Sequence, residues 1–248
     1  MVELVFGDPN ALDIIMAALT GILGGIVLAV AYKWAAQGVA KWKPRKIVHI
    51  SMGTIIALTV MHYSNLSGPS LAAGIFLTIL LYAWAHKSTL ITELLLAGSR
   101  NEDQRLSTFA AGFMGMLAFA SVFIFFFQQP EIIVASILAV SWGDAAGEVI
   151  GRPYGGRLIK RRIKGKSFEG SLGVFLFSCL SVLVALMVFP SGIAALSVLP
   201  QIAIVALVIT LIELVSIAWI DNFLIPILTA IILWQAIFPA TPFWFLML

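Results

Sequence analysis

Residues 143–171 (GDAAGEVIGRPYGGRLIKRRIKGKSFEGS) gather acidic and basic side chains into one short interval. Asp144 and Glu148 stand four residues apart. On a helix their carboxylates would project from one face, one turn apart, and could share a divalent cation. Seven Lys or Arg residues follow between Arg152 and Lys166, and positive charge attracts phosphate. The segment therefore predicts a combined phosphate and metal site.

Glycines and a small-residue turn in this segment indicate how a phosphate would be held. Glycine lowers the steric cost of bringing backbone close to a ligand. A turn of small residues opens the apolar run that begins near residue 171. The first N–H groups of a helix lack internal partners, and its dipole favours anions there. The nucleotide-binding candidates are Gly151, Arg152, Gly155, Lys164, Lys166, Ser167, Gly170 and Ser171.

The basic run at residues 160–162 has a second interpretation. Such a run on the cytoplasmic side often does no more than set topology or touch anionic lipid. The two interpretations are about equally supported for these three residues, whereas Lys164 and Lys166 directly precede the helix-opening turn.

The composition is that of a polytopic membrane protein. Of the 248 residues 61% are hydrophobic and 11% charged, and the mean hydropathy is +1.05. Because a helix needs about 20 apolar residues to cross a bilayer, we expect an all-α bundle of about eight transmembrane helices, forming a single domain over residues 1–248. The expected spans are 13–31, 47–61, 70–85, 107–127, 132–150, 171–189, 196–217 and 222–238.

The fifth span places the acids. Its purely apolar part, residues 132–142, is too short to cross unless the helix continues through Asp144 and Glu148. The two carboxylates are therefore expected at the membrane-buried end of that helix.

The distribution of basic residues predicts the orientation. All 15 Lys and Arg residues fall in the loops 32–46, 86–106 and 151–170, which lie on one side if the N-terminus is outside. The positive-inside rule makes that side cytoplasmic. The site is therefore expected on the cytoplasmic face, beside a basic Gly-rich loop.

Further acids are expected at the same face. An Asp in mid-span costs about 2.5 to 3.5 kcal/mol on insertion scales, so it should meet a cation. One such acid is often paired with Lys or Arg for packing alone, but several beside a basic loop favour a metal. Carboxylates with no His or Cys nearby suit Mg²⁺. The candidate metal ligands are Asp144, Glu148, Glu213 and Asp221.

Several patches of the chain resemble the CTP-dependent lipid-alcohol kinases that include dolichol kinase and phytol kinase. They are similar to the family's GDxxA(D/E)xxGRxxG, KSxEGS and DNxxxP elements, and to its RKxxH near the start of an early span. Departures are Pro153 after the GR pair and Gly147 where Ala is usual. The matching residues are Gly143, Asp144, Gly147, Glu148, Gly151, Arg152 and Gly155, then Lys166, Ser167, Glu169, Gly170 and Ser171, then Asp221, Asn222 and Pro226, and finally Arg45, Lys46 and His49.

The RKxxH element is weak by itself. Arg45 and Lys46 are also ordinary flanking charges, and a lone His inside a helix is more often a packing residue. His49 lies one turn beyond Arg45 on the same helix face. With the other patches, the three residues become candidates for nucleotide binding.

The resemblance implies transfer of the CTP γ-phosphoryl group to the hydroxyl of a long-chain isoprenoid alcohol of dolichol, phytol or geranylgeraniol type. The products would be a polyprenyl phosphate and CDP, with Mg²⁺ as cofactor and no nucleic-acid partner. The alcohol would enter from the bilayer and CTP from water. The implied catalytic residues are Asp144, Glu148, Lys166 and Glu169, with Glu148 or Glu169 as base, Asp144 and Asp221 on the metal, and Asn222 nearby.

Two alternatives come from other classes. A CTP-dependent cytidylyltransferase acting on a lipid phosphate would share an acid-rich GR loop, but that family normally shows Ser-Pro-Lys-Lys-Thr where residues 165–167 read Gly-Lys-Ser. An ion-coupled transporter could also use intramembrane acids. The sequence has no internal repeat that would favour it.

Overall fold

The fold is known from a computed structural model, which describes residues 7–86, 89–97, 105–155, 166–189, 192–216 and 220–240. Within these ranges the regular secondary structure is helical and contains no strand, so the predicted all-α class is confirmed. The chain forms two compact units, Met1–Met116 and Leu117–Leu248. Each unit is described by itself.

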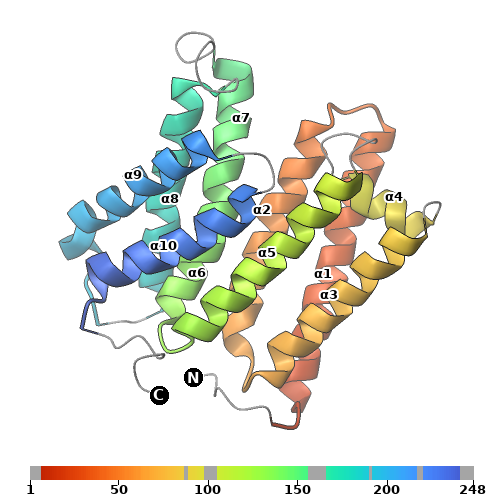
Figure 1. Cartoon of the computed structure of the whole chain (residues 1–248), viewed down its shortest axis with the longest axis horizontal. Coiled ribbons are helices and arrows are strands. Elements are labelled where there is room, and N and C mark those ends of the chain that lie inside the picture. Colours follow the sequence, from red (N-terminus) through yellow and green to blue (C-terminus); the bar gives the residue numbers. More distant parts are fainter. Residues whose placement is uncertain are drawn as a thin grey trace. The chain divides into compact units, whose positions relative to one another are not determined.

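The first unit is organised around its longest helix. In this unit α1 packs against α2, α3 and α4 (Figure 1). The helix α4 is short and lies within the predicted loop 86–106. The sequence did not indicate it. Its Glu93 accepts a hydrogen bond from Tyr32 Oη at 3.2 Å. The elements are α1 (Ala11–Ala36), α2 (Trp42–Thr59), the 3₁₀ turn η1 (Val60–His62), α3 (Ser67–Ala85), α4 (Leu90–Ala97) and the beginning of α5 (Arg105–Phe126).

The N-terminus of α1 carries a fully buried acid. Asp13 and Asn10 form a reciprocal capping box, in which Asp13 Oδ2 accepts from Asn10 N at 3.0 Å. The same carboxylate accepts from Ser64 N at 2.8 Å and Ser64 Oγ at 2.6 Å. Gly68 comes close enough that a Cβ there would lie 2.9 Å from Asp13 Oδ1. Asp13 thus ties the start of α1 to the segment before α3.

The second unit is built on one long helix made of three pieces. Here α6 (Pro130–Leu138), the π-helical turn η2 (Ala139–Gly143) and α7 (Asp144–Tyr154) follow without a break. This confirms that the fifth span continues through Asp144 and Glu148. The helix is the best buried candidate span, with 72% of its window buried against 17% for α1.

The other helices of this unit surround that central helix. In the second unit α8 packs on α6, η2 and α7, α9 packs on α8, and α10 packs on α9 and α6 (Figure 1). The surrounding elements are α8 (Phe168–Val188), the 3₁₀ turn η3 (Ala195–Val198), α9 (Leu199–Val215) and α10 (Asp221–Ile237).

The number of spans differs from the prediction of about eight. In the described ranges, six helices are long and apolar enough to cross a bilayer. The other two predicted spans also form helices, but α10 has only 17 residues. Three basic residues crowd the first turns of α2, namely Lys43, Arg45 and Lys46. The chain is a multi-pass membrane protein. The helix α10 is shorter than the six candidate spans, and α2 is more polar than they are.

Candidate functional site

The start of α8 is formed by a capped turn. Ser167 has extended backbone, and its Oγ accepts from Gly170 N at 3.1 Å. Ser167 is buried, with 7% exposed. The predicted helix start is therefore confirmed, and the Ser167 hydroxyl serves as its cap. Lys166 directly precedes this cap, and the first N–H groups of α8 follow it.

Lys166 is bound by a residue from a distant part of the chain. Its Nζ donates to the carboxylate and to the backbone oxygen of Glu213, near the end of α9. The side chains are 23% and 9% exposed, respectively. Burial in an apolar bundle strengthens such a pair and makes an unpaired charge costly.

The charges of two further carboxylates act on this ion pair. Glu213 interacts electrostatically with Lys166 and also with Asp144 and Asp221. Glu213 and Asp221 are 6% and 4% exposed. Acids on α7, α9 and α10 therefore interact electrostatically, and their predicted role as metal ligands stays a prediction. Lys166 is the cation within this carboxylate group, defined here as Asp144, Glu213 and Asp221.

Glu148 and Arg152 pair with each other one turn further along α7. The distance from Arg152 Nε to Glu148 Oε1 is 2.7 Å, and the two side chains are 56% and 15% exposed. Glu148 was predicted to bind a metal, and Arg152 was predicted to bind phosphate. Since the Arg152 side chain is largely exposed, it can exchange Glu148 for another anion.

The glycines of α7 form a column that faces α8. A Cβ added at Gly147 would lie 2.8 Å from Val174 Cγ2, and one at Gly155 would lie 2.5 Å from Ser167 Oγ. A Cβ at Gly170 of α8 would lie 2.7 Å from Gly147 O. Close backbone approach is the use of glycine predicted from the sequence, but the surface approached by Gly147 and Gly151 is α8. The members of the column are Gly143, Gly147, Gly151 and Gly155.

Glu169 offers a buried acceptor near the same turn. Among the described residues its Oε2 has no hydrogen-bond partner. Glu169 is the second residue of α8 and lies three residues after Lys166. Of the two predicted bases, Glu169 therefore has a carboxylate oxygen that is not engaged, whereas Glu148 holds Arg152.

Four further predicted site residues lie in the first turns of α2 and α10. Arg45, Lys46 and His49 occupy the first two turns of α2 in the first unit, where Lys46 is 3% exposed. Asn222 follows Asp221 in the first turn of α10. Lys164 falls outside the described residues. The nucleotide-binding role of these residues stays a prediction.

The carboxylates on α7 and α10 can be compared with the ligands that Mg²⁺ requires. In the described ranges, no group of three or more His, Cys, Asp and Glu side chains is spaced to hold a metal ion. However, Mg²⁺ usually takes one or two carboxylates and completes its shell with water and phosphate oxygens. The hard oxygens of Asp144 and Asp221 fit that requirement.

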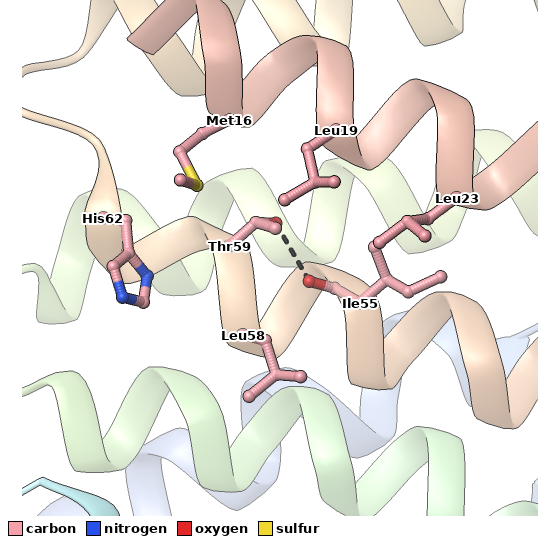
Figure 2. Close-up of a pocket in the computed structure, with 7 residues that line it drawn as sticks. All are labelled: Met16, Leu19, Leu23, Ile55, Leu58, Thr59 and His62. Carbon is pink, nitrogen blue, oxygen red and sulfur yellow. Dashed lines mark hydrogen bonds between the residues drawn. The ribbon is translucent and has the colours of Figure 1, made fainter. Parts of the chain in front are cut away.

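A groove in the first unit was not predicted. It encloses about 280 Å³ between α1 and α2 and is lined mainly by apolar side chains (Figure 2). Thr59 lies in its wall, where its hydroxyl donates to Ile55 O at 2.9 Å. Apolar residues in spans are too common for sequence to mark such a groove. Its lining suits a hydrocarbon chain and contains no Lys or Arg side chain that could bind a phosphate. The lining residues are Met16, Leu19, Leu23, Ile55, Leu58, Thr59 and His62.

The comparisons with known proteins point to one kind of enzyme. No family model matches the chain, and no solved structure matches it. The chain is 27% identical over 222 residues to CTP-dependent diacylglycerol kinase 1 of Eremothecium gossypii, covering 80% of this chain and 68% of the relative. It is 27% identical over 152 residues to CTP-dependent diacylglycerol kinase 1 of Saccharomyces cerevisiae, covering 58% of this chain and 51% of the relative. The chain is thus similar, over most of its length, to enzymes named as CTP-dependent lipid kinases.

Proposed function

We propose that this protein is a CTP-dependent lipid kinase. The observation that carries the proposal is the buried pair of Lys166, just before α8, and Glu213, whose charge also interacts with Asp144 and Asp221. Phosphoryl transfer needs cations on the phosphates, acids for the metal and a base near the acceptor. The similarity to two CTP-dependent kinases supports the choice of nucleotide.

In the proposed reaction the lipid hydroxyl oxygen attacks the γ-phosphorus of CTP. The bond between that phosphorus and the oxygen bridging to the β-phosphate breaks, giving a lipid phosphate and CDP. Glu169 accepts the hydroxyl proton, while Lys166 and the N–H groups of α8 bind phosphate oxygens. Asp144 and Asp221 would hold Mg²⁺, which neutralises the phosphate charge when bound.

The lipid acceptor has two candidates. The relatives are named for diacylglycerol, which makes it the first candidate. The motifs at residues 143–155 and 166–171 resemble those of isoprenoid-alcohol kinases, which makes a polyprenol the second. Either tail would stay in the bilayer, because each CH₂ moved to water costs about 0.8 kcal/mol.

One labelling experiment tests the reaction and the acceptor together. Purified protein in nanodiscs receives γ-labelled CTP, Mg²⁺ and diacylglycerol, geranylgeraniol or dolichol. We expect labelled lipid phosphate from at least one alcohol, and the best acceptor names the substrate. Label in pyrophosphate when phosphatidate is supplied would identify a cytidylyltransferase, and no nucleotide-dependent product from any lipid would refute the kinase proposal.

We also propose that the site faces the cytoplasm with the N-terminus outside. The support is the confinement of all Lys and Arg to one set of loops. Reporter fusions at the N-terminus and near residue 160 should report opposite sides of the membrane. Signals from the same side would refute this orientation.

A further inference from the structure

The hydrogen bonds of Lys166 indicate a role for Glu213 that differs from metal binding. A lysine ammonium has three donors. In the described part of the chain, Lys166 makes two hydrogen bonds, both to Glu213, across 47 residues of sequence. One donor is left for a further acceptor.

The place of Lys166 makes that third donor useful. Lys166 directly precedes Ser167, the N-cap of α8. Lys166 therefore directly adjoins the helix end at which N–H groups favour phosphate oxygens. A free lysine has many rotamers, and fixing it in advance reduces the entropy lost when a ligand binds.

The surroundings of Glu213 agree with a holding role. The residue is 6% exposed, and its Oε1 lies 3.9 Å from the position that a Cβ on Gly147 would take. The same Oε1 accepts from Lys166. Asp144 and Asp221 supply carboxylates on other helices, so the group still contains acids for a metal.

We propose that Glu213 is a positioning residue, which holds the Lys166 ammonium at the start of α8 so that its third N–H meets a phosphate oxygen of the nucleotide. This inference rests on the proposed kinase function. It replaces the predicted role of Glu213 as a metal ligand, and the two roles lead to different measurements.

Nucleotide and metal dependence separate the two roles. CTP binding is measured in EDTA by equilibrium dialysis for Glu213→Gln, Glu213→Asp and wild type. We expect Glu213→Gln to weaken metal-free CTP binding about tenfold, the loss of one charge-assisted contact, and Glu213→Asp to recover part of it. The Mg²⁺ concentration for half-maximal activity should stay within about twofold.

A matched control is Glu131→Gln, since Glu131 is equally buried near the other end of the long central helix. Its CTP binding should equal that of wild type. An unchanged CTP affinity in Glu213→Gln, with a Mg²⁺ requirement raised about tenfold, would overturn the proposal and make Glu213 a metal ligand. Gel filtration and thermal unfolding confirm that each variant is folded.

A second measurement tests the contact without relying on kinase activity. Reductive methylation followed by peptide mass spectrometry compares Lys166 with the exposed Lys33 of α1. We expect Lys166 to react more slowly in wild type and to approach Lys33 in Glu213→Gln. Equal rates in wild type would overturn the proposal. If wild type neither binds CTP nor phosphorylates lipid, the kinase function fails, while faster methylation of Lys166 in Glu213→Gln than in wild type would still show that Glu213 holds it.

Discussion

Two buried acids in this chain meet different kinds of partner. Asp13 in the first unit and Glu213 in the second are 0% and 6% exposed. Asp13 accepts from the neutral groups Asn10 N, Ser64 N and Ser64 Oγ. Glu213 is bound by a lysine and lies near two further carboxylates.

Under the proposed function, the difference separates a structural acid from one that acts in the site. Neutral donors from Asn10 and Ser64 satisfy the Asp13 carboxylate, which needs no ligand from outside the protein. Glu213 is instead paired with a charged lysine and interacts electrostatically with Asp144 and Asp221, and buried charged groups of this kind are typical of functional sites. Burial alone therefore does not distinguish these two acids, whereas the charge of their partners does.

The largest effect is expected from Asp144→Asn. Losing a carboxylate that is proposed to hold Mg²⁺ against the phosphates should lower lipid phosphorylation about 100-fold to 1,000-fold. Initial rates with γ-labelled CTP measure the change, and Asp13→Asn serves as the buried-acid control. Near-normal activity of folded Asp144→Asn would remove the functional half of the comparison.

The next effect concerns stability. Asp13→Ala leaves the donors of Ser64 and the N-terminus of α1 without their acceptor, so the free energy of unfolding should fall by about 2 to 4 kcal/mol. Denaturant unfolding followed by tryptophan fluorescence measures it. The exposed Asp8→Ala should change stability by less than about 0.5 kcal/mol. Equal effects of the two substitutions would contradict the structural role of Asp13.

A smaller effect is expected from the contact between α7 and α8. Gly147→Ala would press on Val174, which should cost about 1 to 3 kcal/mol of stability. Gly21→Ala is the matched control, because a Cβ there meets nothing within 4 Å. That control should be neutral or gain up to about 1 kcal/mol from helix propensity. A neutral Gly147→Ala would show that the two helices are not in tight contact.

The smallest effect is expected at the exposed pair on α7. Glu148→Gln removes the partner of Arg152, whose side chain is 56% exposed. Such pairs are worth about 0.3 to 0.5 kcal/mol, so unfolding should barely change. A loss as large as that of Asp13→Ala would place Glu148 with the structural acids.

Much of the fold follows from the sequence because the apolar runs are long. The continuation of the central helix through Asp144 was predictable from the shortness of its apolar part. The helix α4 was missed because an eight-residue apolar stretch between charged residues also fits a loop. The π-helical turn η2 carries no residue pattern that distinguishes it from α-helix.

The helices that carry the candidate residues were predictable, but the pairing of those residues was not. Spacing brought Asp144 and Glu148 together on one helix face, and the position of Lys166 before a helix start was also evident. The partnership of Lys166 with Glu213 spans 47 residues and depends on how α9 packs against α8. Likewise, the glycines indicated close approach without saying that the neighbour was a helix.

The turn η2 bears on how this chain tolerates changes in length. A π-turn contains one residue more than an α-turn. Removing one residue from Ala139–Gly143 would therefore restore an ordinary helix and leave Asp144 facing as it does now. Removing one within α7 would swing everything beyond it by about 100°. The extra residue of the π-turn can therefore be lost without changing the direction in which Asp144 faces.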